Sequence, residues 1–284
     1  MPADLHCHSK ISDGSTEVDE LVLLAKNKGL DTLSVTDHDT LAGSDRAAVF
    51  GEKFGVRIIK GVEISCFDYE RKRNVHLLCY LPSSRERLSS MLRTVNRNRK
   101  QAVQLAIQKV MRAYPIPYDM ILRRSAGSNT LFKQHIMRAL MDAGYTNEMF
   151  GDVYRKLFDS RFGIARVDFE HPDIFEGLRI VRESGGVAVL AHPAVYDSYD
   201  IIPELIKNGL DGIEISYPRA REDDEDVLGR ICDEYGLIRT GGTDFHGGNG
   251  SAPHPLGTCT TSDEEVGKII ALAGKRVSDT QKIV

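Results

Sequence analysis

Histidines and carboxylates recur in this chain at the ends of short apolar runs, which is where metal ligands are often placed. Of the nine histidines, six lie in or just after such runs, and three carboxylates occupy equivalent positions. Imidazole combined with carboxylate favours zinc, manganese or iron over calcium. Nine candidate ligands exceed the coordination sphere of one ion, so we expect two to three divalent ions, Mn, Fe or Zn. The candidates are His6, His8, Asp13, His38, Glu63, His76, His192, Asp244 and His246.

The first two candidates, His6 and His8, have the spacing His-x-His. On an extended strand this spacing places both imidazoles on the same side, because side chains alternate with period two. Two ions a few Å apart can activate a hydroxide and clamp a phosphoryl group during in-line attack. The pattern therefore predicts a metal-dependent phosphoesterase. Asp37, Asp39 and Glu214 also lie near strand ends, where we expect them to cap helices or to orient neighbouring groups.

The elements that must position these residues can be read from hydrophobic patterning. Short β-prone runs lie at 3–7, 32–35, 56–64, 75–81, 187–191, 212–217 and 237–240, and stretches of helical period separate most of them. This alternation favours a parallel sheet, so we predict an α/β fold, a distorted seven-stranded (β/α)7 barrel. All strand C-termini of such a barrel open on one face, where the candidate ligands would converge.

Residues 85–168 break the alternation, because they show helical patterns and no convincing strand. Helices are expected at 89–113, 131–143 and 148–158. We predict a helical insertion or lid subdomain at 85–168, and a catalytic barrel domain formed by 1–84 and 169–284. The alternative is a helical layer that only covers the core.

The composition constrains the class of protein. A 284-residue chain with 41% hydrophobic and 27% charged residues is typical of a globular enzyme, and its net charge of −4 argues against extended nucleic acid as a partner. Five cysteines without a C-x-x-C pair argue against a disulfide framework or a zinc finger and favour a reducing cytoplasm. We expect no membrane span and no signal peptide, since neither pattern occurs. The oligomeric state is left open.

Five ordered motifs resemble those of the PHP (polymerase and histidinol phosphatase) domain phosphoesterases. The Ser-Asp-Gly variant, together with a helical insertion after the fourth predicted strand, is similar to the branch that includes nucleoside 3',5'-bisphosphate phosphatases. The motifs are Asp4-Leu5-His6-Cys7-His8-Ser9 with Ser12-Asp13-Gly14, Thr36-Asp37-His38-Asp39, Gly61-Val62-Glu63, Ala191-His192-Pro193 and Gly242-Thr243-Asp244-Phe245-His246-Gly247.

The resemblance implies a division of the ligands among three ions and a hydroxide nucleophile that bridges two of them. It also implies catalytic roles for Glu63, His192 and Asp244. Other branches have a histidine where this chain has Asp13, and an aspartate there favours manganese or magnesium in the third site. The implied sets are His6, His8, Glu63 and Asp244 for the first ion, Glu63, His76 and His192 for the second, and Asp13, His38 and His246 for the third.

The insertion departs from the family pattern. Related sequences carry Arg-Pro-His before a helix, whereas this chain reads Phe132-Lys133-Gln134-His135. We predict that Lys133 and His135 contact a substrate phosphate remote from, or flanking, the one that is cleaved, because they lie at an expected helix start where backbone N–H groups also favour anions. Arg161 is a third substrate-binding candidate.

Three functions remain open on the sequence alone. The leading one is hydrolysis of small phosphate esters: a nucleotide, a sugar phosphate, or a ribose cyclic phosphodiester followed by the resulting monoester. The second is a 5'-3' exonuclease acting on short nucleic acids with the same ions, and the third is a non-catalytic metal-binding module. Loss of ligands would indicate the third, and none is missing. The second rests on basic residues that could line a groove: Arg71, Lys72, Arg73, Arg93, Arg97, Arg99, Lys100, Arg123 and Arg124.

Overall fold

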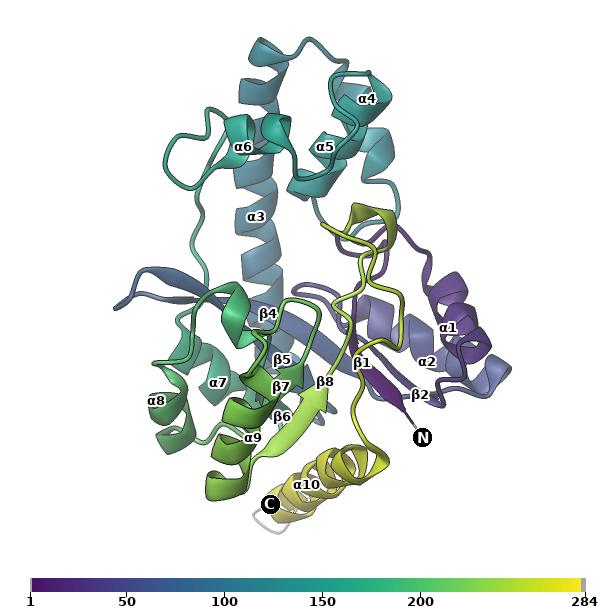
Figure 1. The fold of residues 1–284 in the computed structure, drawn as a ribbon, viewed down its shortest axis with the longest axis vertical. Helices are drawn as coiled ribbons and strands as arrows, with labels where there is room; N and C mark the ends of the chain where they lie inside the picture. Colours follow the sequence, from purple (N-terminus) through teal and green to yellow (C-terminus); the bar gives the residue numbers. More distant parts are fainter. Residues whose placement is uncertain (1, 282–284) are drawn as a thin grey trace.

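The computed structural model describes residues 2–281, in which eight strands form two sheets (Figure 1). The smaller sheet is parallel and has the order β1 (Ala3–Cys7), β2 (Thr32–Val35), β3 (Arg57–Ile58). The larger sheet has the order β4 (Gly61–Asp68), β5 (Arg73–Tyr80), β6 (Val187–Leu190), β7 (Gly212–Ser216), β8 (Ile238–Gly241).

The prediction of an α/β fold is confirmed, but a closed seven-stranded barrel is not seen in residues 2–281. Within residues 2–281, strand pairing between the two sheets is limited to isolated bridges, including Cys7 with Phe245, which follows β8, and His38 with Glu63. The strand expected at 56–64 is divided between β3 and β4. Both bridges join ends of the two sheets that carry candidate ligands, so these ends lie side by side.

One cause of the difference is the connection between β4 and β5. Only residues 69–72 separate these strands, whereas a parallel crossover needs about a dozen residues or more. The two strands therefore form an antiparallel hairpin in which Ser65 pairs with His76, and β5 also runs antiparallel to β6. His76 consequently comes from the middle of an antiparallel strand rather than from the C-terminal end of a parallel one.

Five helices cover the outer faces of the sheets. Helix α7 shows why they pack there: Ile174, Leu178 and Val181 recur at helical spacing and are all buried against the larger sheet. Between the sheets, the Tyr80 hydroxyl donates to the Leu5 carbonyl at 2.9 Å and joins β5 to β1. Helix α10 (Asp263–Gln281) packs against the apolar cluster between the sheets. The covering helices are α1 (Val18–Asn27), α2 (Ala42–Phe54), α7 (Ile174–Glu183), α8 (Ile202–Lys207) and α9 (Asp224–Tyr235).

Residues 85–168, the predicted insertion, contain four helices: α3 (Glu86–Ala113), α4 (Tyr118–Arg124), α5 (Lys133–Asp142) and α6 (Asp152–Phe158). Helix α4 was not among the expected elements. The long helix α3 runs up from the sheets, and α4, α5 and α6 gather around its far half (Figure 1). Ile107, Ile121, Ile136 and Leu157 form a buried apolar cluster among these helices, separate from those around the sheets.

Two further features bear on the class of protein. All five cysteines are free. In the described part of the chain, every helix is too short or too polar to span a bilayer.

Candidate metal centre

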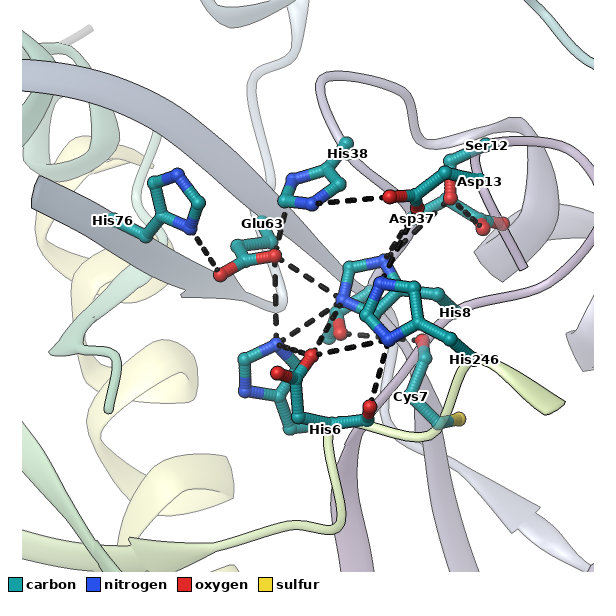
Figure 2. Close-up of polar contacts among 12 residues, drawn as sticks. His6, Cys7, His8, Ser12, Asp13, Asp37, His38, Glu63, His76 and His246 are labelled. Atoms are coloured by element: carbon teal, nitrogen blue, oxygen red, sulfur yellow. Dashed lines mark hydrogen bonds and ion pairs between the residues drawn. The ribbon is translucent and has the colours of Figure 1, made fainter. Parts of the chain in front are cut away.

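All nine candidate ligands lie together where the two sheets meet. Figure 2 labels His6, His8, Asp13, His38, Glu63, His76 and His246 among them. The smaller sheet supplies His6 from β1 and His38 from the loop after β2. The larger sheet supplies Glu63 from β4 and His76 from β5. The others come from loops: His8 and Asp13 follow β1, His192 follows β6, and Asp244 and His246 follow β8.

Glu63 is at the centre of the cluster. Its Oε1 lies 2.8 Å from both His76 Nδ1 and His192 Nε2. Its Oε2 lies 3.0 Å from His38 Nδ1 and 3.1 Å from His8 Nε2. His6 Nε2 also lies 3.5 Å from Oε2, so one carboxylate faces five imidazoles with its two oxygens, an arrangement suited to a ligand shared between ions.

The arrangement of the ligand atoms suits divalent cations bound between them better than it suits hydrogen bonds from one ligand to another. Glu63 Oε2 and Asp13 Oδ1 are buried and close to imidazole nitrogens, but neither accepts a hydrogen bond of normal geometry from the described residues. Buried polar atoms almost always form such a bond. The Nε2 atoms of His6 and His8 face each other at 3.2 Å. Ligand atoms within 4.8 Å of one another form four overlapping groups: His8, Asp13, His38 and His246; His6, His8 and Asp244; His6, Glu63 and His192; and His38, Glu63 and His76.

The carboxyl groups of the cluster are held in their ionised form. Burial by itself raises the pKa of Glu63, but nearby imidazoles, His38 foremost, more than offset it, so the pKa is well below its ordinary value. Burial likewise raises the pKa of Asp13 and Asp244, and His246 leads the groups that lower both pKa values below the ordinary range. Metal binding requires ionised carboxylates, so the lowered pKa values of these three groups suit them as metal ligands.

Glu214 on β7 orients two of the candidate ligands. It is fully buried, its Oε1 accepts from His6 Nδ1 at 3.0 Å, and its Oε2 accepts from the His192 backbone N–H at 2.8 Å. Donation from His6 Nδ1 leaves Nε2 to face the cluster, and such outer partners fix the ring orientation of metal-binding histidines. Glu214 therefore orients neighbouring groups, one of the two roles expected for it.

Asp4 and Asp37 hold the loops that carry two aspartate ligands. Asp37 accepts from the Ser12 hydroxyl at 2.6 Å, one residue before Asp13. Asp4 accepts from the Thr243 hydroxyl, also at 2.6 Å, and Thr243 directly precedes the candidate ligand Asp244. Asp4 was not singled out from the sequence, although it opens the first motif.

Backbone strain is concentrated at the same place. His192 has a φ of 28° and Asp244 a φ of 46°. Residues with a Cβ adopt such conformations at a cost of about 1–3 kcal/mol, and they cluster at functional sites. The surrounding hydrogen bonds hold both residues in this conformation.

The cluster opens into a cavity of about 680 Å³. The helical insertion contributes to its wall, with Gln134 from α5 and Tyr154 from α6. Gln134 Nε2 donates to Asp13 Oδ2 at 2.8 Å, so α5 touches a candidate ligand directly. No sequence pattern marked Gln134 beyond its place between Lys133 and His135.

The three predicted substrate-binding residues do not line this cavity. Lys133 Nζ lies over the Phe158 ring, 5.5 Å from its centroid. His135 is buried, and its Nδ1 accepts from the Phe132 backbone N–H at 3.1 Å. Burial lowers the pKa of His135 to about 4, so its ring is neutral at pH 7 rather than cationic. Arg161 is exposed in the loop after α6.

Comparison with known proteins identifies relatives of this chain. The family model described as the PHP domain matches residues 4–147, just over half of the 284 residues. A protein of Eggerthella lenta named phosphoribosyl 1,2-cyclic phosphate 1,2-diphosphodiesterase is 36% identical over 256 residues, which cover 89% of this chain and 97% of the relative.

Two further relatives have other activities in their names. A 5'-3' exoribonuclease of Haemophilus influenzae is 30% identical over 250 residues, covering 86% of this chain and 89% of the relative. A 3',5'-nucleoside bisphosphate phosphatase of Chromobacterium violaceum is 28% identical over 251 residues, covering 86% of each.

A solved structure from Bifidobacterium adolescentis, described as a metal-dependent phosphoesterase, superimposes with a TM-score of 0.87 at 29% identity and covers 95% of this chain and 96% of the other. The fold, the family model and the relatives agree. This chain belongs to the PHP domain family and is a metal-dependent hydrolase of phosphoric esters.

Proposed function

We propose that this enzyme hydrolyses small ribose phosphate esters, opening a cyclic phosphodiester and then cleaving the monoester that results. The observation that carries the proposal is that the cluster of nine metal-ligand candidates opens into one cavity of about 680 Å³, which seven of them line. That volume suits a ligand the size of a nucleotide or a sugar phosphate. The name of the Eggerthella lenta relative supports a cyclic ribose phosphate.

We further propose that the cluster holds two to three ions of manganese, iron or zinc, with Glu63 shared between two of them. When bound, the ions supply an activated water and neutralise the phosphoryl oxygens. His6 and His192 are held in place by Glu214. Asp13 is held by Gln134, so the insertion helps to shape the third group of ligands.

The two bond cleavages follow from one another. Addition of water to a cyclic phosphodiester breaks one phosphorus–oxygen bond. One sugar oxygen is released as a hydroxyl, and the phosphate remains as a monoester on the neighbouring sugar oxygen. Addition of a second water releases inorganic phosphate and the free alcohol. The same phosphorus atom reacts twice, so one site serves both steps.

We also propose that the insertion acts as a lid. Phe150 and Tyr154 line the cavity from the insertion, opposite loops that follow the strands of the larger sheet. An enclosed site favours a small substrate over a polymer.

The second candidate function is 5'-3' exoribonuclease activity, which the Haemophilus influenzae relative carries in its name. A groove for an extended RNA strand combines many basic side chains with stacking rings. Among the described residues that line this cavity, Arg219 is the one lysine or arginine. This composition favours the small ester.

A substrate screen with the manganese-loaded enzyme tests the proposal. The panel contains ribose cyclic phosphates, nucleoside bisphosphates, sugar monophosphates and short 5'-phosphorylated RNA. We expect the highest kcat/KM on a ribose cyclic phosphate, with inorganic phosphate as the final product. Faster hydrolysis of short RNA than of every small ester would overturn the proposal in favour of the exoribonuclease.

A further inference from the structure

Among the described residues that line the cavity, one is an arginine or lysine, and it lies next to a candidate ligand. Arg219 lies in the loop after β7, lines the cavity, and is 52% exposed. Its Nη2 lies 3.3 Å from Asp244 Oδ2. A guanidinium carries five N–H donors, and this is its one polar contact in the described structure, so most of its donors remain available to a ligand.

The loop that carries Arg219 is held at both ends by one buried carboxylate. The Tyr217 hydroxyl donates to Asp224 Oδ2 at 2.7 Å, and the Arg221 backbone N–H donates to the same oxygen at 2.8 Å. The Tyr217 hydroxyl also accepts from the Ala194 N–H at 2.9 Å, which ties this loop to the one that follows His192. A side chain presented from such a fixed loop can act in a defined position.

The neighbouring arginine of this loop faces elsewhere. Arg221 is 53% exposed, pairs with Asp197 Oδ1 at 2.6 Å, and stacks over the Tyr199 ring at 4.2 Å from its centroid. It does not line the cavity. Two arginines of equal exposure, two positions apart, thus differ in whether they face the metal centre.

We propose that Arg219 binds the phosphoryl group that is being cleaved. Asp244 belongs to the candidate ligand groups, so a phosphoryl group held at this centre comes within reach of the adjacent guanidinium. The planar fork of arginine binds two phosphate oxygens at once. This inference rests on the proposed phosphoesterase site and assigns to it a contact with the scissile phosphate, whereas the contact predicted for Lys133 and His135 was with a remote or flanking phosphate.

The test measures the affinity of the manganese-loaded protein for inorganic phosphate by titration calorimetry, with metal content determined for each variant. We expect Arg219→Ala to weaken phosphate binding by about 10- to 100-fold, which corresponds to the loss of a charged hydrogen bond. Arg219→Lys should recover part of the affinity, because lysine keeps the charge but not the fork. Arg221→Ala is the matched control and should stay within about twofold of the parent, like other surface changes.

Kinetics then separate the scissile phosphate from a remote one. Arg219→Ala should reduce kcat/KM by the same factor on a ribose ester with a second, uncleaved phosphate and on its counterpart without one. A loss confined to the doubly phosphorylated ester would overturn the assignment. So would unchanged phosphate affinity, or a loss of bound metal that accounts for the effect.

Failure of the proposed function would look different. If the parent enzyme left every ribose cyclic phosphate intact, the choice of substrate would be wrong. The calorimetric comparison of Arg219→Ala with Arg221→Ala would still decide whether Arg219 binds phosphate.

Discussion

At the scale of single residues, the centre depends on carboxylates that face several imidazoles. Glu63 faces five histidines, two with Oε1 and three with Oε2. Glu214 stands behind the cluster and contacts His6 and His192 without facing the cavity. Changes at these two carboxylates should therefore have different consequences.

Glu63→Gln should lower kcat by several orders of magnitude while the fold is largely kept. The amide has nearly the same shape but lacks the charge that two ions would share, so both water activation and phosphoryl clamping suffer. Steady-state kinetics and elemental analysis of the purified variant provide the measurement. A variant with more than about a tenth of the parent activity and intact metals would contradict the role of Glu63 as a shared ligand.

Glu214→Gln should weaken metal binding about 10- to 100-fold, the usual cost of losing an outer partner of a metal-binding histidine. The neutral amide cannot accept as strongly from His6 Nδ1, so the ring is less well oriented and less basic. Competition with a chelator of known affinity measures the effect. Glu234→Gln on the exposed surface of α9 is the control. Equal metal affinity in both variants would show that Glu214 has no part in metal binding.

At the scale of elements, α3 joins the insertion to the metal centre. Arg99 on α3 forms an ion pair with Asp39 and donates to Ser65 Oγ at 2.8 Å. Its guanidinium lies over the rings of Phe132 and Phe169. Asp39 is fully buried and directly follows the candidate ligand at position 38, so α3 helps to fix that loop.

Arg99→Ala should destabilise the protein by about 3–5 kcal/mol, because it leaves the Asp39 carboxylate buried without a charged partner. Urea unfolding of the metal-loaded protein measures the change. Arg97→Ala, at an exposed position of the same helix, should change stability by no more than about 0.5 kcal/mol. Similar values for both variants would mean that the Arg99–Asp39 pair does not fix α3 to the sheets.

At the scale of the whole molecule, the candidate ligands come from both sheets, and strand pairing between the sheets is limited to isolated bridges in the described residues. His6 and His38 belong to the smaller sheet, whereas Glu63 and His76 belong to the larger. Ions bound among them would link the two sheets in the folded state alone. Metal binding should therefore contribute to global stability.

Elemental analysis after expression with manganese should find two to three ions per chain, and a chelator should lower the Tm. Each site should contribute about 2.7 kcal/mol when free metal is at 100 times its Kd. Differential scanning calorimetry of the loaded and stripped protein measures the shift. One ion or none in the loaded protein, or a Tm that is the same after complete stripping, would contradict a multinuclear centre that joins the sheets.

The sequence by itself determined the identity of the clustered residues and the α/β class. Short motifs such as Asp4-Leu5-His6-Cys7-His8 carry their information locally, because strand periodicity places alternate side chains on one face. Nine ligand-type residues at the ends of apolar runs had to meet if those runs formed neighbouring strands. The structure brings all nine together.

Only the tertiary structure decided the strand directions and which polar side chains reach the cavity. β4 and β5 form a hairpin because β4 extends to Asp68 and β5 begins at Arg73, which leaves a connection too short for a parallel crossover. The apolar runs in the sequence do not show that the strands extend so far. Consecutive residues at the start of α5 point in directions about 100° apart. Packing of α5 on its apolar cluster buries His135 and turns Gln134 toward Asp13. Arg219 faces the cavity because distant residues hold its loop, and no local pattern encodes those contacts.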